Sequence, residues 1–257
     1  MTGIRLVYDN YVKQADLEQT EGGANEQFPL ANLQNASPSI KWRSDGNTAK
    51  VVFDLKQTRN IDSVIIIGDP VGTFGVTAAS VKFSTTTDFS SADPVTINLS
   101  SDQSLGYAFF DETSRRYVEL TLTGTGSYAE VGAIMIGARL DIPQNNLSID
   151  SFSYGHEDLS RVQYNRYGQA FIDRLPQIKS IGGTLEFATK AEQSLLDDTL
   201  LFSGTGRPIF MMVDINGEAM EDGEFKLAIY GYVQAAPVWS AAGGQHYSTT
   251  LNVRQAV

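Results

Sequence analysis

The chain has 257 residues, no cysteine and a formal net charge of −11, from 19 basic and 30 acidic side chains. Without cysteine it can form neither a disulfide nor a thiolate metal site or nucleophile. The excess of acidic charge should repel nucleic acid, so we expect no sequence-specific nucleic-acid binding. No apolar stretch approaches 18 residues and no secretory signal is visible at the start, so we expect no membrane insertion.

The first half reads as short β-strands separated by turn-forming residues. A polar loop ends at Trp42, and apolar and polar side chains alternate in residues 51–56, as in a half-buried antiparallel strand. Residues 58–60 predict a turn, and the β-branched run at 61–67 predicts a central strand. Further short strand-like runs lie at residues 81–83, 95–99, 108–110 and 117–122, and their regular spacing favours a β-sandwich.

This order of parts resembles the discoidin-like (coagulation-factor C-type) β-sandwich family. The resemblance rests on Trp42, on the Val-Phe-Asp-Leu run at 52–55, and on the segment 128–137, which closes on Gly137. It covers about residues 1–140 and departs from the family in that no disulfide can tie the ends together. Members of that family mostly bind surfaces such as glycans or lipids, so the resemblance implies a cell-surface glycan as one possible partner.

Residues 141–146 are predicted to join two domains. Pro143 cannot donate a hydrogen bond to a β-ladder, and two asparagines follow it closely, so regular pairing should stop there. We therefore assign residues 1–143 to a discoidin-like β-sandwich and residues 148–257 to a second domain.

The second half contains the one convincing helix of the chain. Thr189 and Glu192 have the spacing of a capping box, and apolar positions then recur at helical intervals through Leu200. Asn216 and Gly217 are typical of a hairpin turn. Strand-like runs lie on both sides of the helix, at residues 162–164, 167–171, 184–187, 209–215, 225–233 and 247–253. The predicted fold class is mainly β: an N-terminal discoidin-like antiparallel β-sandwich plus a C-terminal β-barrel or split sandwich with one α-helix.

This second half is similar to the ring-forming β-barrels of tailed-bacteriophage tail tubes and distal tail proteins. The similarity rests on residues 182–187, the helix from Thr189, residues 208–215 and residues 245–253. It implies a structural component of a phage tail tip or baseplate, a homo-oligomeric ring that docks other tail proteins. Its location would be the tail of the virion, after assembly in the host cytoplasm. The strand at 247–253 and the turn at 216–217 are the expected assembly elements.

No residue pattern predicts catalysis, a cofactor or a metal centre. His156, next to Glu157 and Asp158, is interpreted as part of a solvated turn rather than a metal site. The carboxylate pairs at 197–198 and 221–222 are interpreted as solvated. We therefore expect no enzyme activity, while a glycan hydrolase with an unrecognised carboxylate pair is left open as a rival function.

Three aromatic side chains are candidates for a ligand or subunit contact. Trp42 stands immediately before a core strand and is interpreted as packed rather than as a platform for a sugar. Phe74 has glycines close on both sides and is the surface candidate for ligand binding; otherwise it folds back on the sandwich edge. Trp239 is core or a subunit contact, and the sequence leaves its role open. The alternative to a tail protein is a carbohydrate-binding adhesin that recognises cell-surface glycans.

Overall fold

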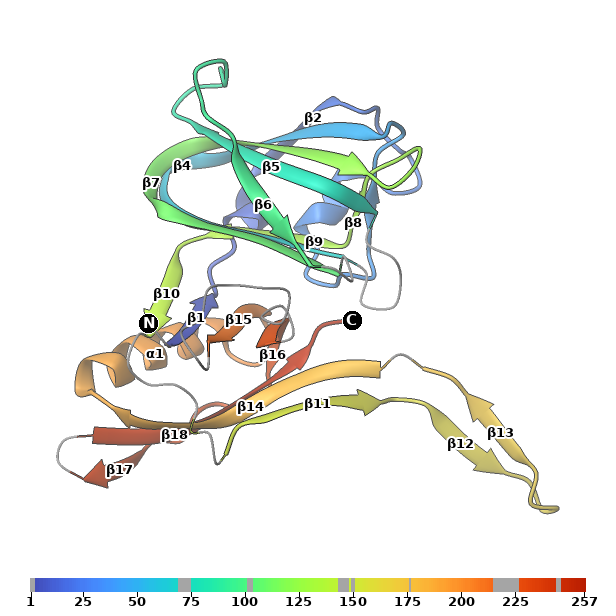
Figure 1. Ribbon diagram of the computed structural model, residues 1–257, viewed down its shortest axis with the longest axis vertical. Coiled ribbons are helices and arrows are strands. Elements are labelled where there is room, and N and C mark those ends of the chain that lie inside the picture. The colour runs from blue at the N-terminus through green and yellow to red at the C-terminus, as the bar shows by residue number, and fades with distance from the viewer. Residues whose placement is uncertain are drawn as a thin grey trace.

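The computed structural model describes residues 3–68, 75–100, 104–142, 148, 151–175, 177–214, 227–243 and 246–257. The described chain is built of antiparallel strands, two short 3-10 helices and one α-helix, so the mainly β fold class predicted from the sequence is confirmed. Figure 1 shows a β-sandwich stacked on a second sheet, from which a long hairpin projects to one side. No helix in the described part of the chain is both long and apolar enough to cross a membrane.

The elements follow one another in this order. The first half contains β1 (Gly3–Val7), η1 (Tyr11–Gln14), β2 (Asp16–Glu21), η2 (Leu30–Gln34), β3 (Trp42–Arg43), β4 (Thr48–Ile67), β5 (Val76–Ser84), β6 (Val95–Leu99), β7 (Leu105–Gly124), β8 (Glu130–Val131), β9 (Ala133–Gly137) and β10 (Arg139–Ile142). The second half contains β11 (Ser153–Asp158), β12 (Arg161–Tyr164), β13 (Ala170–Asp173), β14 (Gln177–Ala188), α1 (Lys190–Ser203), β15 (Ile209–Asp214), β16 (Ala228–Val233), β17 (Ser240–Gly243) and β18 (His246–Gln255).

Two bent strands of 20 residues, β4 and β7, pair with each other and contribute to both layers of the sandwich. β2 and β5 flank one end of this pair, and β9 and β6 flank the other. The sequence predicts two strands with a turn at 58–60. The chain instead continues as one strand, because an irregularity between Asp54 and Arg59 bends it without ending the pairing. Lys56, at the bend, has a φ of 69°.

The carboxylate of Asp54 holds this bend. It accepts a hydrogen bond of 2.8 Å from the backbone N–H of Lys56. Both its oxygens also accept from the guanidinium of Arg116, at 2.8 Å each. A bidentate pair of this kind fixes geometry as well as adding energy, so the bend has a defined direction.

The second sheet has the order β10-β1-β15-β16-β18-β14-β11, with β17 beside β18. Its edge strands β10 and β11 do not pair with each other, so the described sheet is open and does not form the closed barrel that was one of the two predicted forms. α1 covers one face through Leu196, Thr199 and Leu200. The predicted capping box is present: Thr189 Oγ1 accepts from Glu192 N, and the Glu192 carboxylate accepts from Thr189 N.

The two halves of the chain both contribute strands to the second sheet, and this sheet shares a core with the sandwich. The predicted domain boundary near residues 143–147 lies outside the described residues. β1 and β10 precede that boundary, yet they pair with each other, and β1 also pairs with β15 of the second sheet. Along β15, Ile209, Met211 and Val213 face the cluster under α1, while Phe210 and Met212 face the sandwich. The second sheet is therefore buried on both faces along β1, β15 and β16, and the two halves pack as one body.

Candidate functional site

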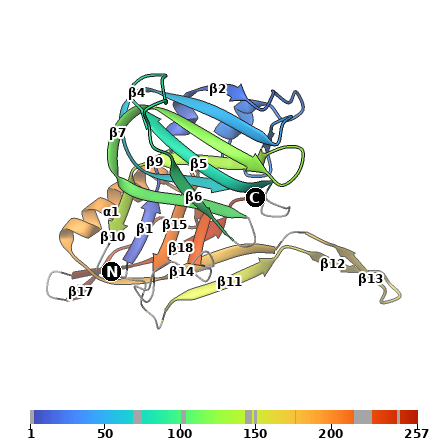
Figure 2. The same ribbon diagram turned by 45° about the horizontal axis from the view of Figure 1, so that its top comes forward.

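The hairpin of β12 and β13 extends beyond the body of the protein and has no core of its own (Figures 1 and 2). Every residue from 161 to 175 is exposed except Asn165 at the turn, which is half-buried. The Asn165 side chain accepts from the N–H groups of Tyr167 and Gln169, at 2.9 and 3.0 Å, and Gly168 has a φ of 79°. An isolated two-stranded hairpin is at best marginally stable in water. We call residues 161–173 the arm.

One face of the arm is apolar. Val162 lies opposite Ile172, and Tyr164 lies opposite Ala170. Residues directly opposite each other in an antiparallel pair share a face, so these four side chains form one surface. Val162, Tyr164 and Ile172 are 50%, 72% and 58% exposed. The other face carries Arg161, Gln163, Phe171 and Asp173. Such alternation is typical of a half-buried strand, but here the apolar face is open to solvent.

The arm is also basic, in a chain that is otherwise strongly acidic. Residues 161–173 contain two arginines, Arg161 and Arg166, and one carboxylate, Asp173, which gives +1, and Arg174 follows directly. The rest of the chain therefore carries −12, since the total is −11. A basic, apolar arm on an acidic protein is suited to a partner surface that is apolar and acidic.

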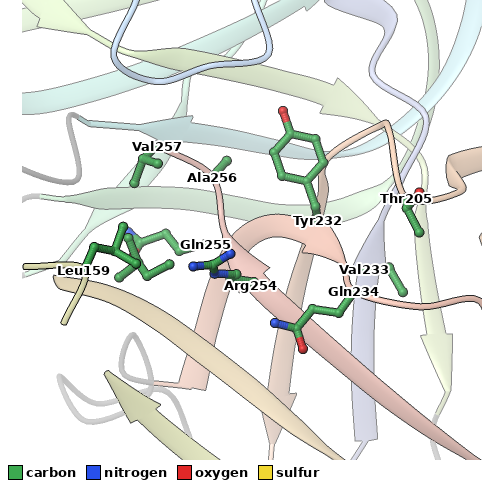
Figure 3. Close-up of a pocket in the computed structure, with 10 residues that line it drawn as sticks. Leu159, Thr205, Tyr232, Val233, Gln234, Arg254, Gln255, Ala256 and Val257 are labelled. Carbon is green, nitrogen blue, oxygen red and sulfur yellow. The ribbon is translucent and has the colours of Figure 1, made fainter. Parts of the chain in front are cut away.

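A groove of about 570 Å³ opens at the base of the arm, where Leu159 connects β11 to β12 (Figure 3). Its walls include Ile178, Val233 and Ala256. Arg254 is its one ionic side chain, and its guanidinium lies 3.0 Å from a carboxylate oxygen of Glu157 on β11. Figure 3 shows Leu159 on one side of the opening and Thr205 on the other. The groove can receive a segment of apolar side chains.

A second groove, of about 620 Å³, lies on the sandwich next to β5, β6 and β7 and is more polar. The half-buried rings of Phe83 and Phe110, with centroids 4.7 Å apart, provide its aromatic surface. Asp93, Asp111 and Arg115 line it together with hydroxyl side chains. Aromatic rings beside hydrogen-bonding groups match the apolar faces and the hydroxyl groups of sugars.

A cluster of ion pairs around the buried carboxylate of Glu130 closes the end of the sandwich where β3 meets β8. Arg43 donates from Nε to Glu130 at 2.8 Å and also contacts it through Nη2, and Lys41 Nζ lies 3.2 Å from the same carboxylate. The Arg43 guanidinium lies between the rings of Phe28 and Tyr128, at 4.4 and 4.1 Å from their centroids. Both rings and the carboxylate are thus engaged within the cluster, which holds the surrounding loops together. Sequence reasoning missed it because its members are far apart in the chain.

The aromatic candidates have different positions. Trp42 is fully buried in the core of the sandwich, as expected for a packed residue. Phe74, the surface candidate for ligand binding, lies outside the described residues. Trp239 packs against the core of the second sheet and donates from Nε1 to Asp197 on α1. That contact gives Trp239 a structural role and shows that Asp197 is not simply solvated.

The other candidate residues are not brought together. His156 lies on β11, next to the ring of Tyr154. Among the described residues, no group of three His, Asp or Glu side chains is arranged to hold a metal ion. The pair at 221–222 and the turn at 216–217 lie outside the described residues. Residues 247–253 do not offer a free edge for assembly, because β18 pairs with β14 on one side and with β16 and β17 on the other.

No protein-family model matches the chain, and no curated protein matches it. Solved structures that match about half of it include carbohydrate-binding modules and lectin domains. A family 32 carbohydrate-binding module from Clostridium perfringens in complex with GalNAc-β-1,3-galactose has 13% sequence identity and a TM-score of 0.43, over 51% of this chain and 100% of that chain. Another family 32 module from C. perfringens, from NanJ and in complex with galactose, has 12% identity and a TM-score of 0.42, over 52% and 100%. The lectin domain of lectinolysin, complexed with Lewis B antigen, has 12% identity and a TM-score of 0.42, over 50% and 95%.

Proposed function

We propose that this chain is a structural protein that assembles with copies of itself through its arm. The observation that supports this most strongly is the exposed apolar face formed by Val162, Tyr164 and Ile172. Burial of apolar surface is worth roughly 25 cal/mol per Å², and at least half of each of these three side chains gains none of it from its own chain. A hairpin that projects with an uncovered apolar face is stabilised when another chain covers that face.

The tail tip of a tailed phage is the setting that the layout of predicted elements in the second half implies. In that setting the second sheet and its arm would form a ring, and the sandwich would be held outward for neighbouring tail proteins. The shared core between the sandwich and the second sheet supports such a role, because a sandwich packed in this way keeps a fixed orientation on each copy.

The solution mass of the full chain over a range of concentrations tests this proposal. We expect multimers that dissociate on dilution, because each copy carries both a strong charge and an exposed apolar face. Sedimentation velocity or native mass spectrometry gives the number of copies. A chain that stays monomeric up to high concentration would contradict self-assembly, and a ring purified from phage particles would support the tail setting.

Binding of cell-surface glycans by the sandwich is the second candidate function, supported by the polar groove with Phe83 and Phe110 in its wall. Aspartate and arginine side chains beside aromatic rings would give such a site both hydrogen bonds to sugar hydroxyls and an apolar contact. In this case the molecule would act as an adhesin, and the groove would carry its affinity.

A glycan array followed by calorimetry tests this candidate. Asp111→Asn should weaken binding of any glycan held in the groove, whereas Glu112→Gln, the neighbouring carboxylate outside the groove lining, should not. Equal binding by both variants would place the glycan elsewhere, and no binding to any glycan would remove the candidate. Cleavage of a bound glycan that is lost in Asp111→Asn would instead favour the rival hydrolase function.

A further inference from the structure

The outer face of α1 carries large apolar side chains that the chain itself covers only in part. Leu201 is 80% exposed, and Leu195 and Phe202 are also exposed, although the Phe202 ring packs edge-on against Tyr8 and next to the guanidinium of Arg207. The inner face of the same helix is buried on the second sheet through Leu196, Thr199 and Leu200. A surface helix normally has an apolar stripe on one side and polar residues on the other. The outer side of α1 thus carries exposed leucines beside the carboxylate of Asp198, a mixed surface that an assembly can cover.

Val238 extends this apolar surface. The contact from Trp239 Nε1 to Asp197 brings the segment between β16 and β17 onto the helix. Asp197 is one helical turn before Leu201, so both lie on the same side of α1. Val238, which precedes Trp239, is 83% exposed. We call Leu195, Leu201, Phe202 and Val238 the helix face.

The charge of α1 is opposite to that of the arm. α1 contains Lys190 and three carboxylates, Glu192, Asp197 and Asp198, which gives −2, against +1 for the arm. Asp198 is exposed on the outer side of the helix. Charges of opposite sign on two apolar surfaces favour their encounter and disfavour the pairing of either surface with itself.

The arm and α1 lie on opposite sides of the molecule. In both views the arm projects on one side, and α1 and β17 lie on the other (Figures 1 and 2). An arm therefore extends away from the helix face of its own chain. Two different surfaces on opposite sides of a subunit form a heterologous contact, which repeats from copy to copy and closes into a ring when the rotation allows.

We infer that the arm of one copy docks on the helix face of the next, so that copies join head to tail. This inference rests on the proposed self-assembly and names the two surfaces that meet. Val162, Tyr164 and Ile172 would cover Leu195, Leu201 and Val238 of the neighbour. The arginines of the arm would lie near the carboxylates of α1. The groove at the base of the arm would remain outside this contact.

Mixing two assembly-defective variants tests the head-to-tail contact. The arm variant, Val162→Ser with Ile172→Ser, keeps its helix face, and the helix variant, Leu195→Ser with Leu201→Ser, keeps its arm. All four side chains are at least 47% exposed, so both variants should fold, as circular dichroism melting can confirm. Each variant alone should be monomeric. Their mixture should give a dimer and nothing larger, because one intact arm meets one intact helix face.

Other results separate failure of this inference from failure of self-assembly. If the helix variant alone still forms multimers, the arm docks elsewhere and the inference is overturned while the proposed function stands. If both variants are monomeric and their mixture gives no dimer, the head-to-tail contact is also overturned. If the unaltered chain is monomeric, both proposals fall.

Disulfide trapping locates the contact directly, since the natural chain has no cysteine. Copies carrying Tyr164→Cys, mixed with copies carrying Leu201→Cys, should form a cross-linked heterodimer under mild oxidation. Phe171→Cys, on the opposite face of the arm, and Ile40→Cys, on the sandwich, serve as matched exposed controls and should cross-link far less. Preferential cross-linking of Tyr164→Cys to Thr205→Cys would place the arm in the groove at its base and overturn the inference.

Discussion

Phe210 on β15 and Tyr107 on β7 lie with their ring centroids 6.3 Å apart, across the boundary between the second sheet and the sandwich. They belong to a buried cluster to which both halves contribute. Tyr230 adds a hydrogen bond of 2.9 Å from its hydroxyl to the carbonyl oxygen of Ala36 in the first half. The two halves are thus coupled through apolar packing as well as through β1 and β10.

This coupling predicts that the whole chain unfolds in one transition. Phe210 is fully buried, so Phe210→Ala should cost about 3–5 kcal/mol. Each half holds one tryptophan, so each can serve as a single fluorescent reporter. Trp42→Phe leaves Trp239 as the reporter of the second half, and Trp239→Phe leaves Trp42 as the reporter of the sandwich. Within each variant, fluorescence and far-UV circular dichroism should give the same midpoint, and Phe210→Ala should lower the free energy of unfolding by a similar amount in both. A fluorescence midpoint that differs from the dichroism midpoint of the same variant, with only the Trp239 signal responding to Phe210→Ala, would mean that the halves unfold independently.

Trp42 should matter for stability. Because it is fully buried, Trp42→Ala should lower the free energy of unfolding by about 3–5 kcal/mol, through lost burial and the cavity left behind. Its Nε1 has no hydrogen-bond partner among the described groups, so Trp42→Phe should be milder. Phe171→Ala, at an exposed position of the arm, is the control and should leave the monomer's melting temperature nearly unchanged. An unchanged melting temperature in Trp42→Ala would show that Trp42 is not a core residue.

Asp54 should contribute to the dependence of the free energy of unfolding on pH in the acid range. Hydrogen bonds from Arg116 lower the pKa of Asp54 below its usual value. A carboxyl group stabilises the fold when its pKa is lower in the folded chain than in the unfolded chain. This stabilisation is fully present above the unfolded pKa, which is about 3.9 for Asp. It is lost as the pH falls through the folded pKa. Asp54→Asn should therefore be less stable than the natural chain at neutral pH, with a difference that shrinks in acid.

Urea unfolding between neutral pH and about pH 2.5 measures this difference. Burial raises the pKa of Asp9 and of Asp62, which acts in the opposite direction, but both are present in each variant and cancel in the comparison. Asp111→Asn, which removes an exposed carboxyl group, is the control. A difference between Asp54→Asn and the natural chain that stays constant with pH would contradict the role of the Arg116 contact.

Salt should strengthen self-assembly. Each copy carries −11, whereas the arm contributes only +1 and α1 only −2, so overall repulsion outweighs the local attraction at low ionic strength. Raising the ionic strength from about 0.02 to 0.3 M shortens the screening length to several Å and should shift sedimentation toward larger species. Dissociation by salt would indicate an interface held mainly by ion pairs.

Local patterns in the sequence predicted local structure well. The spacing of Thr189 and Glu192 identified the start of α1, and the alternation in residues 117–122 identified part of β7. Long-range pairing was not predictable in the same way. Residues 58–60 look like a turn because a bend within a continuous strand uses the same residue types, and the short β1 gives no sign that its partners are β10 and β15.

The candidate site was predictable only in part. Residues 162–164 and 167–171 were recognised as strand-like, but alternation reports which side chains share a face and not what covers that face. Nothing in the sequence showed that Val162 and Ile172 would be left open to solvent. For the same reason, residues 247–253 were predicted to pair with a neighbouring subunit. They belong to β18, which lies inside the sheet between β16 and β14.

The proposed assembly is tested most directly by two neighbouring substitutions on β13. Phe171 and Ile172 are 60% and 58% exposed but lie on opposite faces of the arm. Sedimentation velocity of the full chain should show that Ile172→Ser shifts the protein to monomers, while Phe171→Ser assembles nearly as the natural chain does. Loss of assembly in Phe171→Ser with full assembly in Ile172→Ser, or no effect of either, would contradict docking through the apolar face of the arm.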